Sequence, residues 1–104
     1  MAEAAATPVR NNEAAGRFEV EVDGLVAYTE YRRLASGVLF PHTETPPALE
    51  GRGLASLVVR TALDWARAEG RLVLPTCPYV SAWIVRHPDY HDLVHPDYRT
   101  ALGI

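Results

Sequence analysis

The 104-residue sequence has little of several features that mark particular protein classes. It contains a single cysteine, Cys77, so an internal disulfide is excluded and a reducing compartment is favoured. It has no excess of positive charge, and its net charge of −3 argues against nucleic-acid binding. No apolar run approaches the ~20 residues that a membrane-spanning helix needs. The first ten residues lack the basic and apolar regions of a secretory signal. We therefore expect a cytoplasmic protein that binds neither nucleic acid nor membrane.

The length and composition indicate one globular domain. About half of the residues are hydrophobic and 22% are charged, which is typical of a folded soluble chain. Residues 1–16 are rich in Ala, Glu and Asn and offer little to bury, so we expect a loose N-terminal tail there. The domain is then expected to cover residues 17–104.

Alternating residues predict strands in the first half of the domain. Phe18, Val20 and Val22 alternate with glutamates, and Asp23-Gly24 is a strong signal for a two-residue hairpin turn into residues 25–33. A third strand is expected from Val38 toward Thr45, before two consecutive prolines stop it. These strands form an antiparallel meander.

Helical periodicity dominates the second half. A helix is expected over residues 54–69, ended by Gly70, and the residues predicted to form its buried stripe are Leu54, Leu57, Val58, Thr61, Ala62 and Trp65. The apolar run 72–74 predicts a buried strand, and a second helix is expected over residues 78–86. A helix followed by a buried strand implies a crossover with parallel pairing. The predicted fold is therefore mixed α/β (α+β): a meander, one βαβ crossover and a C-terminal helix on a small sheet.

A glycine turn runs directly into the first of these helices. The initial backbone N–H groups of a helix lack internal partners, and the peptide dipoles place partial positive charge there, so a phosphate can bind. Gly51 and Gly53 permit positive φ and close approach of the backbone, and Arg52 offers a charged donor. The same residues are also compatible with an ordinary tight turn.

Several motifs occur together: His42-Thr43-Glu44, Pro47, Glu50-Gly51-Arg52-Gly53-Leu54-Ala55, Pro75-x-Cys77-Pro78-Tyr79-Val80 and Arg86-His87-Pro88-Asp89-Tyr90. In combination they resemble the small, single-domain branch of the GNAT N-acetyltransferase superfamily, over about residues 17–95. The resemblance implies that acetyl-CoA is the cofactor, that the glycine loop holds its pyrophosphate, and that its pantetheine arm lies between two splayed parallel strands, residues 38–45 and 72–75. The cofactor-binding residues that it implies are Thr43, Glu44, Thr45, Gly51, Arg52, Gly53, Leu54, Ala55 and Tyr79.

Two departures from the broader superfamily bear on function. Ala48 stands three residues before the first glycine, where many members carry Arg or Gln. The pyrophosphate would then depend on backbone N–H groups and Arg52. The chain also lacks the two helices that follow the first strand in larger members and wall the acceptor site. The resemblance therefore leaves the identity of the amine acceptor open.

Cys77 is the first candidate for chemistry. It immediately precedes a predicted helix and follows the last predicted strand, where ligands of α/β folds bind. A helix N-terminus favours the thiolate. Cys77 would accept the acetyl group transiently as a thiolate or protonate the departing CoA as a thiol. The alternative is that Cys77 is a small buried hydrophobic residue.

Three further residues of the motifs are candidates for supporting roles. An imidazole titrates near neutrality, so His42 is a candidate general base that would deprotonate an amine or activate Cys77 across the splay. The alternative is that His42 is a surface histidine at a strand end. Glu44 falls on the same strand face as His42 and would orient it or attract a cationic amine. Tyr79 would donate its hydroxyl to a thiolate, or else only pack.

The C-terminal segment offers a competing pattern. His87, His91 and His95 recur every four residues, a spacing that on one helix would suit zinc. Pro88 and Pro96 argue against one continuous helix, so we expect a docked tail and no metal.

The leading hypothesis is an acetyl-CoA-dependent N-acetyltransferase that acts on an unidentified primary amine, with Cys77 and His42 as catalytic residues. The alternatives are a non-catalytic module that binds CoA or acyl-CoA, and an interaction protein that kept the fold without the cofactor.

Overall fold

A computed structural model describes residues 8–104 and contains seven strands and five helical segments among them. The strands are β1 (Arg10–Asn12), β2 (Arg17–Val22), β3 (Leu25–Glu30), β4 (Arg32–Leu34), β5 (Gly37–Leu39), β6 (Thr43–Glu44) and β7 (Val73–Leu74). The helical segments are η1 (Pro47–Leu49), α2 (Leu54–Ala68), α3 (Pro78–Val85), η2 (Pro88–Leu93) and α4 (Pro96–Leu102). The predicted α/β class is confirmed, as are the meander, the crossover and helices after the last strand.

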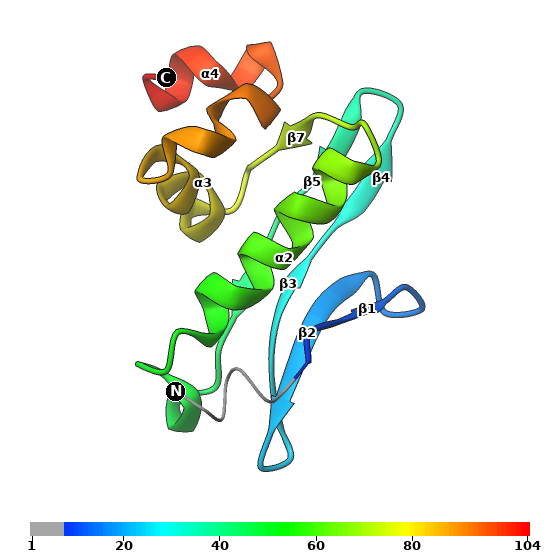
Figure 1. Ribbon diagram of the computed structural model, residues 1–104, viewed down its shortest axis with the longest axis vertical. Helices are drawn as coiled ribbons and strands as arrows, with labels where there is room; N and C mark the ends of the chain where they lie inside the picture. Colours follow the sequence, from blue (N-terminus) through cyan, green and yellow to red (C-terminus); the bar gives the residue numbers. More distant parts are fainter. Residues whose placement is uncertain (1–7) are drawn as a thin grey trace.

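The strands form two sheets that meet end to end. One sheet has the order β1-β2-β3-β6 with antiparallel pairing, and the other has the order β4-β5-β7. β5 and β7 pair in parallel, with Val38 opposite Val73 and Leu39 opposite Leu74, which confirms the predicted crossover. Figure 1 shows α2 running along the strands, with α3 and the C-terminal segments beside β7.

The predicted third strand is divided between the two sheets. β5 pairs with β4 and β7, whereas β6 pairs with β3, so the chain changes sheet over residues 40–42. Pro41 lies at this change and has no N–H to donate to a ladder, which interrupts the strand. The prediction of one strand from Val38 to Thr45 was therefore wrong.

β1 corrects a second prediction. Arg10–Asn12 pairs with β2, with Asn11 opposite Phe18, although residues 1–16 were expected to form a loose tail. Glu19 holds this pairing, because its carboxylate accepts hydrogen bonds from Arg10, Arg17 and Asn12 and is almost fully buried. Residues 1–7 of the expected tail lie outside the described residues.

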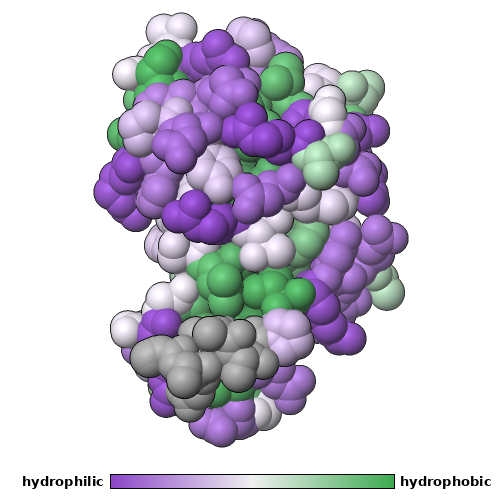
Figure 2. Space-filling model, in the orientation of Figure 1, coloured by the Kyte–Doolittle hydropathy of each residue, from purple (hydrophilic) through white to green (hydrophobic). Residues whose placement is uncertain are grey.

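α2 is rotated relative to the predicted stripe. Leu57, Thr61 and Trp65 are only partly buried, and the buried residues are Leu54, Val58, Val59, Ala62, Leu63 and Ala66. The helix packs on β2 and β3 and also against the segments after β7, so it buries two sides instead of one narrow stripe. Figure 2 shows a hydrophobic area across the middle of the face on which α2 runs in Figure 1.

The interior is divided into two hydrophobic clusters. The large cluster joins the β4-β5-β7 sheet to α3 and the C-terminal segments, and it includes Phe40, Leu63, Val73 and Trp83. The small cluster lies under the loop before α2 and consists of Val20, Val22, Ala27, Leu49, Leu54 and Val58, with Val9 packed against it. The described part of the chain has no helix long and apolar enough to span a membrane.

Candidate functional site

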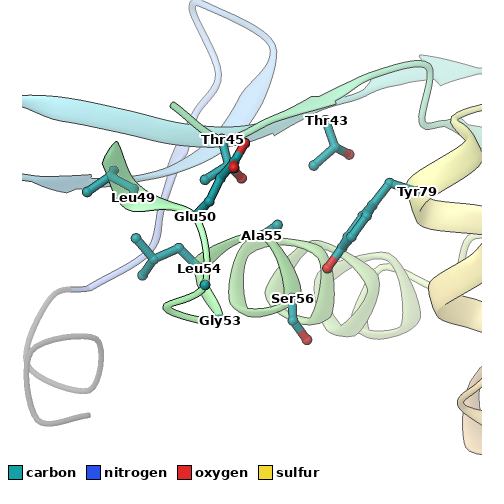
Figure 3. Close-up of a pocket in the computed structure, with 10 residues that line it drawn as sticks. Thr43, Thr45, Leu49, Glu50, Gly53, Leu54, Ala55, Ser56 and Tyr79 are labelled. Atoms are coloured by element: carbon teal, nitrogen blue, oxygen red, sulfur yellow. The ribbon is translucent and has the colours of Figure 1, made fainter. Parts of the chain in front are cut away.

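A cavity of about 380 Å³ lies where β6, the loop before α2 and the start of α3 converge (Figure 3). Its lining residues are Thr43, Thr45, Leu49, Glu50, Gly51, Gly53, Leu54, Ala55, Ser56 and Tyr79. They include seven of the nine predicted cofactor-binding residues. The other two, Glu44 and Arg52, are not among the lining residues.

The glycine loop begins α2 without a side-chain cap. Gly51 and Gly53 have φ values of 83° and 77°, which only glycine adopts without strain, and a Cβ at either position would meet open space. Gly53 is the N-cap residue of α2, no side chain caps this end, and the first turn carries no acidic residue. The N–H groups of Leu54, Ala55 and Ser56 precede the first intrahelical bond, which Leu57 N–H donates to Gly53. This end of the cavity is therefore a concentration of backbone donors suited to an anion.

The chain segments around Cys77 diverge at the other end of the site. The amide N–H groups of Phe40 and Cys77 donate to the carbonyls of Leu74 and Phe40, at 3.0 and 2.9 Å. Beyond this point β6 continues in the other sheet and residues 78–85 turn into α3. The two strands that the resemblance implies to be splayed, within residues 38–45 and 72–75, are therefore paired as far as Phe40. Only beyond this point does a gap open between β6 and the start of α3, and Thr43 and Tyr79 line it.

Cys77 is a member of the large cluster, buried behind Thr43, and it is not among the residues that line the cavity. It is buried, with 3% of its surface exposed, and it is the N-cap residue of α3 although its side chain makes no capping bond. Its Sγ instead donates to Thr43 Oγ1 at 3.5 Å. Because Thr43 lines the cavity, this contact connects the thiol to the cavity wall.

His42 and Glu44 lie on the opposite face of β6 from Thr43, because successive residues of a strand alternate. His42 Nε2 is 2.9 Å from Glu44 Oε1, and the hydrogen bond from His42 lowers the pKa of Glu44 below its usual value. Tyr28 of β3 also donates to Glu44, at 3.4 Å. The structure therefore does not bring His42 into contact with Cys77; it places one on each side of the same strand.

Tyr79 projects from α3 toward the first turns of α2 (Figure 3). Burial raises the pKa of its hydroxyl, and Arg86 opposes this in part. The hydroxyl therefore keeps its proton at neutral pH and remains a hydrogen-bond donor in the cavity wall.

Leu49, Glu50 and Ser56 line the cavity but were not predicted. Ser56 is the third residue of α2 and accepts a hydrogen bond from Trp83 Nε1 at 2.8 Å, which ties the start of α2 to α3. Its position in the first helical turn, among the free N–H groups, was the available signal. Glu50 is exposed and follows η1, and no sequence pattern separates it from other surface glutamates.

The three C-terminal histidines belong to different local structures. His87 stacks on Trp83 with ring centroids 3.7 Å apart, and His91 Nε2 lies 2.9 Å from the Ile84 carbonyl at the end of α3. His95 caps α4 by accepting from Asp97 N–H. No group of three or more potential metal ligands occurs among residues 8–104.

A family model of GCN5-related N-acetyltransferases matches residues 17–93, about three quarters of the chain. The match covers all the described strands except β1, together with the cavity and Cys77. A comparison with curated proteins finds no match. The chain belongs to the GCN5-related N-acetyltransferase family, and this membership supports acetyltransferase activity in general.

Proposed function

We propose that the protein transfers the acetyl group of acetyl-CoA to a primary amine. The observation that carries this proposal is the cavity, which has an uncapped helix N-terminus at one end and a wall residue hydrogen-bonded to Cys77. The helix N-terminus suits the anionic pyrophosphate of acetyl-CoA, and the end near Cys77 suits its reactive thioester. The protein is expected to be cytoplasmic.

The fit at the anionic end rests on the donor set. The N–H groups of Leu54, Ala55 and Ser56 would hold the pyrophosphate, with the open space over Gly51 and Gly53 allowing it to approach the backbone. Arg52, in the same loop, would add a charged hydrogen bond. Glu50 lines the same cavity and opposes binding by its negative charge.

The reactive end would receive the acetyl thioester, which supplies the electrophilic carbonyl. Cys77, a thiol donor in the structure, would give its proton to the leaving sulfur as the bond between carbonyl carbon and sulfur breaks. The new bond forms between that carbon and the amine nitrogen. Tyr79 would donate a hydrogen bond to developing negative charge.

His42 would remove one proton from a cationic amine on the outer face of β6, so that the neutral amine then attacks the thioester. β6 is an edge strand that pairs only with β3, so its free edge faces the gap toward α3. An amine that approaches over the outer face would meet His42 before the gap. Glu44 fixes the imidazole through the 2.9 Å contact and stays ionised at neutral pH, which would attract a cationic amine. The nitrogen would pass its second proton to Cys77 once the bond has formed, and His42 would release its proton to solvent.

Thermal unfolding with acetyl-CoA tests the binding part of this proposal. Ligand at about 100 times its Kd should add about 2.7 kcal/mol to the free energy of unfolding. Gly53→Val should abolish this gain. Gly70→Val is the matched control, because Gly70 follows the other end of α2 with φ 71° and equally open space around it. Both variants should be destabilised, but only Gly70→Val should keep its ligand response. A full response in folded Gly53→Val would contradict the proposal.

A further inference from the structure

Thr29 is a polar residue in the middle of an otherwise apolar interior. Its exposed fraction is 0%, and among residues 8–104 only Glu19 joins it as a buried polar or charged residue. The burial of Glu19 is explained by its ion pairs with Arg10 and Arg17, but Thr29 is uncharged and its burial needs another explanation. Valine has the same shape and a high strand preference without a hydroxyl to desolvate. The hydroxyl of Thr29 therefore needs a role.

That hydroxyl contacts the residue that holds Cys77. Thr29 lies opposite Thr43 in the β3–β6 pairing, and their Oγ1 atoms are 2.9 Å apart. Thr29 Oγ1 also lies 3.5 Å from the His42 carbonyl, which accepts from the Glu30 amide as well. Thr43 thus stands between Thr29 and the Cys77 sulfur.

The donor directions follow from counting protons. Each threonine hydroxyl has one proton and two acceptor lone pairs. If Cys77 S–H donates to Thr43, the Thr43 proton goes to Thr29, and the Thr29 proton goes to the His42 carbonyl. This single direction satisfies all three donors. This chain of hydrogen bonds runs from the Cys77 thiol to the backbone carbonyl of His42, whose side chain lies on the outer face of β6.

The same atoms can also serve the thiolate. When the thiol proton has left, Thr43 can turn its proton to the sulfur and Thr29 can turn its own to Thr43. Only two hydroxyl rotations are needed, and no heavy atom moves. We propose that Thr43 and Thr29 are positioning residues that hold the Cys77 thiol and then stabilise the thiolate during acetyl transfer. This proposal rests on the proposed function.

Infrared spectroscopy of the S–H stretch tests the relay directly, because Cys77 is the single cysteine of the chain. The wild-type band should have the lowered frequency of a hydrogen-bonded thiol. Thr43→Val should shift it to the frequency of a free thiol, and Thr43→Ser should restore it. Thr45→Val is the control, since it removes the hydroxyl of another threonine that lines the cavity, and its band should stay at the wild-type position. A wild-type band in Thr43→Val would overturn the proposal.

Thr29→Val distinguishes a relay from a single contact. Without the Thr29 oxygen, the Thr43 proton loses its acceptor and is free to turn toward the sulfur, which displaces the thiol proton. The S–H band should then shift in the same direction as in Thr43→Val. The double variant should show no further shift, because coupled residues are not additive. An unshifted band in Thr29→Val, or additive shifts, would remove Thr29 from the relay.

Steady-state kinetics connect the relay to acetyl transfer. Thr29→Val should lower kcat about tenfold, equivalent to about 1.4 kcal/mol in the barrier, with little change in KM for acetyl-CoA. Thr29→Ser should recover most of the rate. Shifted bands with unchanged kcat would show that the hydroxyls bind the thiol without a role in acetyl transfer, and would overturn the catalytic part. If no variant transfers acetyl groups while the bands shift as expected, the proposed function fails and the relay stands as structure.

Discussion

The two hydrophobic clusters differ in what they support. The large cluster contains Trp83 of α3 and Tyr90 of η2, packed with Val38 of β5 and Val73 of β7. The small cluster has six buried members, and two of them, Leu49 and Leu54, also line the cavity. Damage to the large cluster should therefore unfold the domain, whereas damage to the small cluster should first displace the glycine loop. We therefore expect variants of the large cluster to lose stability, and variants of the small cluster to lose both stability and ligand binding.

The largest expected effect on stability comes from the large cluster. Trp83→Ala removes a buried ring that stacks on His87 and donates to Ser56, so it should lower the free energy of unfolding by about 3–5 kcal/mol. Denaturant unfolding measures this loss. Val85→Ala, on the exposed side of the same helix, is the control and should change stability by about 0.5 kcal/mol or less. Similar losses in both variants would mean that α3 does not pack as described.

Leu49→Ala tests the small cluster. Leu49 is fully buried in η1 directly before the glycine loop, so its truncation should cost about 2–5 kcal/mol. In the protein that remains folded, the stabilisation by acetyl-CoA should also fall, because the loop loses its support. Leu25→Ala truncates an exposed leucine and should leave both quantities near wild type. A normal ligand response in Leu49→Ala would show that the loop is independent of this cluster.

A smaller effect concerns the outer face of the β1-β2-β3-β6 sheet. Burial tends to raise the pKa of Glu19, but hydrogen bonds from Arg17, Arg10 and Asn12 outweigh it and lower the pKa below 4.5. The carboxylate is therefore stabilised by folding. Its contribution is complete above pH 4.5 and is lost as the pH falls through the lower folded value. Acid unfolding of wild type and Glu19→Gln should converge at low pH, and parallel curves would contradict this assignment.

The parts of the fold that follow from local periodicity could be predicted from the sequence. The α2 helix, the β7 strand and the glycine loop are each encoded by neighbouring residues. The phase of α2 could not be predicted, because it depends on the segments after β7, which cover Leu63 and Ala66 from a second side. The pairing of β1 depends on Glu19, which binds Arg10 of β1. A glutamate is usually exposed, so nothing in the sequence indicated that this one is buried.

The candidate site divides in the same way. Its cavity residues are consecutive in the loop and helix and could be predicted. Neighbouring residues of a strand point to opposite faces, so the placement of His42 and Thr43 on opposite faces of β6 could have been predicted from the sequence. The hydroxyl of Thr29 could not be found, since threonine in a strand is ordinary and only the β3–β6 register places it beside Thr43.

The most direct test of the central claim is the rate at which acetyl-CoA releases free CoA with and without a series of primary amines. The account predicts release that depends on the amine and that Cys77→Ala and His42→Ala each reduce at least tenfold, about 1.4 kcal/mol in the barrier. Acetyl-CoA binding should persist in both variants, because neither residue belongs to the glycine loop. Binding of acetyl-CoA to the wild-type protein without amine-dependent release would contradict the claim and would identify a non-catalytic CoA-binding module.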